Sequence, residues 1–344
     1  MVATDDQVLV SADSHVMEPH DLWTKALAQR FGDQAPAFPP LKVGEGAQAH
    51  PGGADARERI KEMSADGVSA EVLYPTLALR LFGLEDAALQ AECFRVYNDW
   101  LIDYCQTAPD RLLGVAAIPC YDIDQAVDEL FRCKRAGLEG AEIWQTPHPD
   151  LPFPSEHYEK LWNALEDVEM PLSLHILTGI SYHSRQGIRG PEAYRGHVNL
   201  KLLDAANALV DFIHYGILEK HPKLKLVIVE NEIGWLPFMI QQWDYYFRRF
   251  QASNPLPIDK EPSYYVQRQV YATFFNDAAG AHNLSWWGQD NCMWSNDFPH
   301  PNSTWPNSRK VIERDLGSLP SDVRAKLVRE NCVRLYGMSV PTTP

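Results

Sequence analysis

The sequence lacks an excess of positive charge. Its 344 residues carry 31 Lys and Arg against 46 Asp and Glu, a net charge of −15 with the histidines neutral. Nucleic acids and anionic membranes attract basic surfaces, so we expect neither as a partner. The chain also lacks any apolar run that approaches the roughly 18 residues needed to span a membrane.

Cysteine is scarce, and the six cysteines are scattered without a CxxC pair. This pattern does not suit a disulfide framework and is typical of a reduced, cytosolic protein. Asp5 and Asp6 stand where a secretion signal would carry basic residues. We therefore expect a cytoplasmic location.

Three common catalytic or cofactor motifs are also missing. No GxGxxG and no GxxxxGK[ST] follows a predicted strand, so nucleotide binding has little support. No GxSxG elbow occurs, so a Ser-His-Asp hydrolase has none either.

What the sequence does contain is a regular alternation of short apolar runs and helical segments. The runs cover residues 8–12, 70–74, 113–118, 141–144, 172–176, 226–230, 269–273 and 292–297. Helical periodicity covers residues 56–66, 86–105, 123–135, 155–168, 198–220, 235–250 and 321–336. Eight such repeats predict a single-domain (β/α)8 TIM barrel over residues 1–344, and an open doubly wound sheet is the alternative. Residues 31–53, 179–197 and 253–263 are predicted insertions or long loops at the carboxyl-end face.

Acidic and histidine side chains follow several of these predicted strands. They are Asp13, His15, Glu18, His175, Glu230, Asp297 and His300. The carboxyl ends of barrel strands meet at one rim, where like charges repel each other unless a cation compensates them. Imidazole and carboxylate together suit Zn, Mn or Fe, so the set predicts a metal site.

Each of these residues alone has an ordinary structural explanation. Asp13 could cap a helix or form a loop salt bridge, and His175 could be a core histidine. Glu18, before Pro19, could start a helix, and His300 could stack in a loop. The prediction depends on their coincidence at the ends of several strands.

The motifs resemble a known family. Residues 11–19, SADSHVMEP, are similar to the first-strand signature of the amidohydrolase-related, decarboxylase-like TIM barrels of the amidohydrolase superfamily. The resemblance continues through residues 59–68, 98–100, 109–119, 161–165, 174–175, 234–238 and 295–300. It implies one divalent metal, ligands Asp13, His15, His175 and Asp297, and hydrolysis or non-oxidative decarboxylation.

One departure from this family occurs after the sixth strand. The family usually carries a histidine there, whereas this chain reads VENEIG over residues 229–234, so that Glu230 or Asn231 takes its place. Glu18, Glu230 and His300 are then left over, and Glu230 could bridge a second ion. This surplus resembles the dinuclear non-heme iron monooxygenase branch of the superfamily, of the platensimycin-pathway type.

The sequence therefore predicts, as its first hypothesis, an Fe/Fe or Fe/Mn monooxygenase that hydroxylates an unactivated carbon of an apolar small molecule. Asp297, Glu230 and His300 would be catalytic, and an external electron donor would supply reductant. Candidates for the pocket wall are Trp144, Tyr182, Trp294 and Trp305.

Two other hypotheses remain open. The chain could be a mononuclear Zn or Mn decarboxylase or hydrolase, in which Asp297 moves the proton, Glu18 orients a ligand and His300 contacts substrate. It could also be a catalytically silent barrel that acts as a partner subunit. A homodimer is expected because dimers are common among such barrels.

Overall fold

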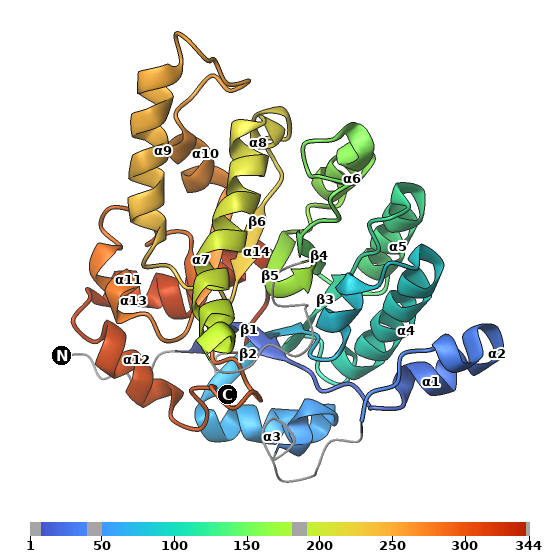
Figure 1. Cartoon of the computed structure of the whole chain (residues 1–344). Coiled ribbons are helices and arrows are strands. Elements are labelled where there is room, and N and C mark those ends of the chain that lie inside the picture. The colour runs from blue at the N-terminus through green and yellow to red at the C-terminus, as the bar shows by residue number, and fades with distance from the viewer. Residues whose placement is uncertain (1–7, 40–49, 181–190, 342–344) are drawn as a thin grey trace.

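Eight parallel strands form one sheet whose order follows the chain, in a computed structural model that describes residues 8–39, 50–180 and 191–341. The strands are β1 (Leu9–His15), β2 (Val68–Tyr74), β3 (Leu112–Ala117), β4 (Gly140–Thr146), β5 (Leu172–Gly179), β6 (Leu226–Val229), β7 (Val270–Phe274) and β8 (Cys292–Trp294). The segment after β8 returns to β1, since the Asp297 amide donates to the Asp13 carbonyl at 3.1 Å. The predicted TIM barrel is confirmed (Figure 1).

Helices surround the strands (Figure 1). They are α1 (Leu22–Ala26), α2 (Ala28–Phe31), α3 (Ala56–Asp66), α4 (Ala87–Cys105), α5 (Ile123–Arg135), α6 (Glu159–Val168), α7 (Pro191–His214), α8 (Ile217–Lys220), α9 (Leu236–Phe250), α10 (Pro262–Gln269), α11 (Ala278–Asn283), α12 (Ser308–Leu316), α13 (Ser321–Ala325) and α14 (Asn331–Tyr336). Within the described ranges, none of them is long and apolar enough to cross a bilayer.

Helix α3 shows how local sequence sets its ends. The Asp55 side chain accepts hydrogen bonds from the amides of Arg57 and Glu58, which satisfies donors that the first turn leaves open. Gly67 ends the helix with a φ of 75°, a left-handed conformation that costs glycine little. The predicted and observed bounds therefore coincide at residues 56–66.

Other helices depart from the predicted bounds. The segment predicted at 198–220 is α7, which begins earlier at Pro191, followed by the short α8. The segment predicted at 321–336 is interrupted by a π-helical turn over Lys326–Glu330. Helix α10 begins at Pro262, at the end of a stretch predicted as a loop, because proline is favoured in the first turn of a helix.

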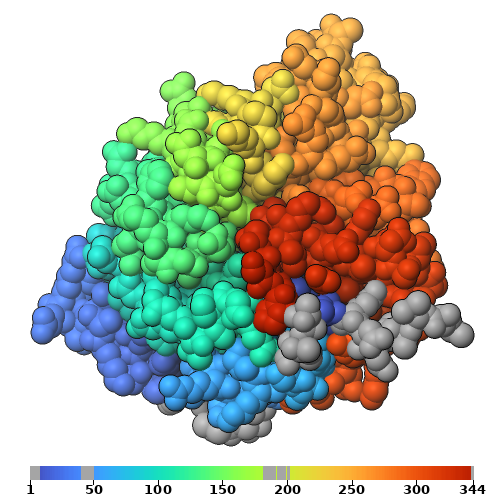
Figure 2. Space-filling view, turned by 180° about the vertical axis from the view of Figure 1, so that it is seen from behind, coloured from blue at the N-terminus to red at the C-terminus, as the bar shows by residue number. Residues whose placement is uncertain are grey.

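Two hydrophobic clusters make up the core. The larger lies between the strands and the surrounding helices. The smaller consists of alternate residues of the strands, such as Val10, Val72 and Val227, together with Cys332 and Tyr336 of α14. Alternate residues of a barrel strand face the interior of the barrel. Since Cys332 and Tyr336 pack against these residues, α14 covers one end of the barrel. Figure 2 shows this C-terminal segment, in red, at the centre of one face.

A buried ion pair ties α3 to the carboxyl end of β1. The Arg59 Nε atom lies 2.5 Å from the Glu71 carboxylate of β2, and both side chains are almost fully buried. The same guanidinium donates to the His15 carbonyl at 2.7 Å and lies over the Phe298 ring. Arg59 therefore fixes the position at which β1 ends.

We predict that Arg59→Ala lowers the free energy of unfolding by about 3 to 5 kcal/mol, because it leaves Glu71 buried without its counter-ion. Urea denaturation of both proteins measures the difference. Arg57→Ala on the exposed side of the same helix is the control and should change stability little. Equal effects of the two substitutions would contradict this role.

Candidate metal centre

Strand β1 brings Asp13 and His15 to the carboxyl end of the barrel, where both are fully buried. The His15 Nδ1 atom lies 2.7 Å from the Pro75 carbonyl oxygen. A carbonyl oxygen only accepts, so Nδ1 carries the hydrogen and Nε2 presents its lone pair towards the Asp13 carboxylate, 3.5 Å away. Burial, with the charges of His300 and His175, holds the pKa of His15 well below its usual value and keeps it neutral.

His175 on β5 has the same arrangement. Its Nδ1 atom lies 2.8 Å from the Ile176 carbonyl oxygen, and its Nε2 atom lies 3.8 Å from Asp13 Oδ1. Burial lowers the pKa of His175, but the nearby Asp13 carboxylate and the charges of Glu142 and Glu230 outweigh it and raise the pKa to about 10. The imidazole therefore lies in a strongly negative environment.

Asp297 and His300 approach from the segment after β8. Asp297 Oδ1 lies 3.4 Å from His15 Nε2 and 2.9 Å from His300 Nδ1. The His300 ring stacks on His15 with centroids 4.0 Å apart, and its Nε2 atom lies 3.0 Å from the Thr76 hydroxyl. Asp297 has a φ of 52°, a left-handed strain that non-glycine residues show most often at functional sites.

These side chains fit a divalent cation. The group Asp13, His15 and His175 and the group His15, Asp297 and His300 each place their ligand atoms within 4.8 Å of one another. Both oxygens of Asp13, Oδ2 of Asp297, and Nε2 of His15 and of His175 are buried without a hydrogen-bond partner among the described residues. Buried polar atoms are normally satisfied, and carboxylate with imidazole is a ligand set of Zn, Mn and Fe.

Of the two residues that could replace a histidine after β6, Glu230 faces this group. Its Oε2 atom lies 3.9 Å from His175 Nε2, and its φ is 59°. Asn231 is fully buried, and its side-chain amide donates to the Val229 carbonyl at 2.7 Å. The backbone conformation at the end of β6 therefore places the Glu230 carboxylate, and not the Asn231 amide, beside the candidate metal ligands.

Glu18 stands outside both groups. Its carboxylate accepts hydrogen bonds from the amides of Thr76, Leu77 and Ala78 at 3.2, 2.9 and 3.0 Å. Burial raises the pKa of Glu18, and these amides partly offset the rise. Glu18 therefore holds the loop after β2, which supplies the partners of both His15 and His300.

The predicted pocket aromatics lie mostly in packing positions. Trp144 is fully buried and donates to the Tyr158 hydroxyl at 3.0 Å. Trp294 is buried in the larger hydrophobic cluster, between the strands and the surrounding helices. Trp305 packs against His50 and Phe298 and donates to the Glu62 carbonyl. Tyr182 lies outside the described residues.

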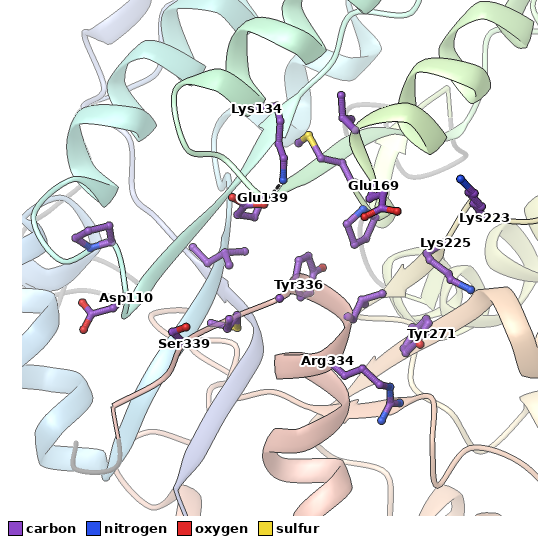
Figure 3. A pocket seen from close by; sticks show the side chains of 18 of the residues that line it. Asp110, Lys134, Glu139, Glu169, Lys223, Lys225, Tyr271, Arg334, Tyr336 and Ser339 are labelled. Carbon is purple, nitrogen blue, oxygen red and sulfur yellow. Dashed lines mark hydrogen bonds and ion pairs between the residues drawn. The ribbon is translucent and has the colours of Figure 1, made fainter.

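A large cavity lies at the opposite end of the barrel. It has a volume of about 1100 Å³ and is lined by residues at or before the starts of strands and by the end of α14, among them Lys225, Tyr271, Arg334 and Tyr336 (Figure 3). No predicted metal ligand lines it. Active sites of TIM barrels lie at the carboxyl ends of the strands, so the side-chain chemistry, and not cavity size, identifies the site.

A polar network outside the predicted ligands supports the centre. Asn296 Oδ1 accepts from the hydroxyls of Ser11 and Ser14 at 3.0 and 2.7 Å, and its Nδ2 donates to Glu71 at 3.0 Å. This network joins β1 to the residue before Asp297. The two serines lie within the first-strand motif, which was the available signal. Glu142, an acid inside the apolar run 141–144, was also overlooked.

This protein is a parallel barrel with carboxylates and imidazoles gathered at the carboxyl ends of its strands. The fold and the site place it in the class of barrel proteins that can hold a divalent cation. Within that class, the chain belongs to the amidohydrolase family, which matches residues 13–338.

Relatives of the chain include gamma-resorcylate decarboxylases. A gamma-resorcylate decarboxylase from Rhizobium sp. is 27% identical over 301 residues, covering 81% of this chain and 86% of its own. One from Rhodococcus jostii is 27% identical over 273 residues, covering 70% and 74%.

Solved structures share the fold. A 5-carboxyvanillate decarboxylase from Novosphingobium aromaticivorans, determined with bound manganese and 3-methoxy-4-hydroxy-5-nitrobenzoic acid, has a TM-score of 0.75. It is 19% identical, and the match covers 97% of this chain and 98% of the other. An amidohydrolase from Mycobacterium avium subsp. paratuberculosis has a TM-score of 0.77 at 17% identity, covering 96% and 100%.

The predicted dinuclear iron monooxygenase is wrong, because the relatives that span most of the chain are decarboxylases. The prediction relied on a count of surplus acidic residues and histidines. One of them, Glu18, already binds three backbone amides, which a count along the sequence does not reveal. The external electron donor was required only by the oxygen-dependent reaction.

We predict that Glu18→Gln lowers the free energy of unfolding by about 1 to 3 kcal/mol, because an amide offers one acceptor oxygen where three amide donors need partners. Thermal and urea unfolding measure the change, with the exposed Glu85→Gln as control. The Mn²⁺ stoichiometry should stay that of the wild type. A loss of metal without a loss of stability would contradict this assignment.

Proposed function

We propose that this protein is a divalent-metal-dependent, non-oxidative decarboxylase of a hydroxylated aromatic acid. The observation that carries the proposal is the convergence of Asp13, His15, His175 and Asp297, with their buried ligand atoms unpartnered among the described residues. The gamma-resorcylate decarboxylases among its relatives support the reaction class. The manganese and the nitrobenzoic acid bound by a protein of the same fold support the cation and the aromatic ligand.

Those four residues would hold a single Mn²⁺ or Zn²⁺ ion. Such an ion acts as a Lewis acid that withdraws electron density from a substrate oxygen. The hydrogen bonds from Nδ1 of His15 and of His175 to backbone carbonyls fix both rings with Nε2 towards the centre. Partners of this kind keep the ligands oriented before the ion arrives.

Decarboxylation also needs a proton. When the bond between the ring carbon and the carboxylate breaks, its electron pair stays on the ring carbon, which then takes one proton as CO2 leaves. Asp297 is the residue that we assign to this transfer. Burial raises the pKa of its carboxyl, opposed by His300, and a raised pKa favours the protonated form that can donate.

His300 would return the proton to Asp297. Its Nδ1 atom lies 2.9 Å from Asp297 Oδ1, and its ring is 18% exposed whereas Asp297 is fully buried. Its Nε2 atom is held by the Thr76 hydroxyl. The histidine therefore connects the buried acid to the partly exposed rim of the barrel.

The direct test is to supply the Mn²⁺-loaded protein with gamma-resorcylate, 5-carboxyvanillate and related hydroxybenzoic acids, and to measure CO2 release and oxygen consumption. The proposal predicts CO2 release with at least one hydroxylated aromatic acid, lost on chelation, and no oxygen consumption. Absence of CO2 release across the panel, with metal bound, would contradict it.

We predict that Asp297→Asn lowers kcat by roughly 10²- to 10⁴-fold, because an amide cannot transfer the proton. The matched control is Asp290→Asn, which changes an exposed acid that precedes β8 and pairs with Lys326. Steady-state kinetics with the best acid of the panel measure both. A kcat for Asp297→Asn close to the wild type would remove Asp297 from the proton transfer.

A further inference from the structure

A single acid lies in the middle of β4, whose sequence is otherwise uncharged. Glu142 pairs laterally with Ala117 of β3 and with Ser173 of β5. Laterally paired residues of a parallel sheet face the same side. The Ser173 hydroxyl lies 2.9 Å from that of Tyr74 on β2, a strand from another part of the barrel wall. Both side chains therefore cross the interior, and Glu142 points there with them.

The layer that contains Glu142 forms the floor of the metal centre. The Tyr74 ring packs against His175 with centroids 5.3 Å apart, and the Tyr74 hydroxyl lies 3.3 Å from that of Tyr336 in α14. Tyr336 also lines the large cavity at the far end of the barrel (Figure 3). Among these floor residues, only Glu142 carries a carboxylate.

Glu142 has no partner within the described ranges. It is fully buried, and neither carboxylate oxygen accepts a hydrogen bond there. A buried carboxyl in this position is costly unless a positive charge compensates it. Burial raises the pKa of Glu142 to about 8, with His175 opposing the rise and Asp13 and Glu18 adding to it.

The groups that act electrostatically on Glu142 are thus part of the metal centre or beside it. Glu142 itself is absent from both groups whose ligand atoms lie within 4.8 Å of one another. A divalent cation held by Asp13 and His175 would add positive charge near Glu142 to the charge that His175 supplies. Because Glu142 is outside both groups of ligand atoms, it suits the role of an acid that acts on the ion through its charge without coordinating it.

We propose that Glu142 is a further positioning residue of this centre, a buried carboxylate that strengthens divalent-cation binding from beneath Asp13 and His175 without being a ligand. The inference rests on the metal centre of the proposed function, and it can be tested without any turnover. Outer carboxylates of this kind affect metal affinity by roughly 10- to 100-fold.

The test compares Glu142→Gln with the wild type in two measurements: Mn²⁺ affinity by calorimetric titration, and melting temperature with and without Mn²⁺. We expect Mn²⁺ affinity to fall by roughly 10- to 100-fold. We expect the metal-free variant to melt at the wild-type temperature or higher, because it no longer buries an uncompensated acid. Glu142→Asp, which keeps the charge, should bind Mn²⁺ more tightly than Glu142→Gln.

Glu129→Gln is the matched control. Glu129 is also buried, but it lies on α5 and is fully partnered by Arg132 and Asn98. Its substitution should lower the melting temperature with and without metal and leave Mn²⁺ affinity unchanged. The same pattern for Glu142→Gln would show a merely structural role and overturn the inference.

The remaining outcomes separate the two proposals. Wild-type Mn²⁺ affinity in Glu142→Gln overturns the role of Glu142 and leaves the decarboxylase proposal intact. A wild-type protein that binds neither Mn²⁺ nor Zn²⁺ overturns both. If Glu142→Gln does not fold, Glu142→Asp decides, since loss of Mn²⁺ binding in a stable, charge-retaining variant contradicts an action through charge.

Discussion

The structure depends on one electrostatic constraint: several carboxylates are buried at one end of a barrel. Asp13 and Asp297 are fully buried, and Glu230 lies within 3.9 Å of the same imidazole that faces Asp13. Carboxylates so close together repel each other, and burial in a medium of low dielectric magnifies the repulsion. Without an ion, His175 compensates part of the charge, which is why its pKa rises to about 10. A divalent cation would balance the same charge more fully.

Much of the fold follows from local sequence. All eight strands lie where short apolar runs predict them, and α3 and α5 match their predicted bounds because aspartate caps start them. The failures have local causes as well. The sequence predicts a loop that includes Pro262, whereas this proline starts helix α10. The π-helical turn at Lys326–Glu330 contains no proline or glycine that would mark it, so the sequence does not reveal it.

Part of the site was predictable because a strand fixes the direction of a side chain, and Asp297, beyond the end of β8, was predictable from the family motif. Asp13 and His15 lie two apart on β1, and the structure brings both together with His175 and Asp297. Glu18 follows the end of the strand, where the backbone direction is no longer set, and it binds amides of the next loop. Glu142 was not among the predicted site residues because it lies inside the apolar run 141–144, which was interpreted only as a buried strand. Counting acidic residues therefore suggested a second metal, and with it the wrong reaction.

The most direct test of the central claim is a crystal structure of the Mn²⁺-loaded protein with anomalous scattering to locate the metal. The account predicts one Mn²⁺ ion at the carboxyl mouth of the barrel, bound by Asp13, His15, His175 and Asp297. An ion bound at another site, or a mouth in which these four side chains contact no metal at saturating Mn²⁺, would contradict it.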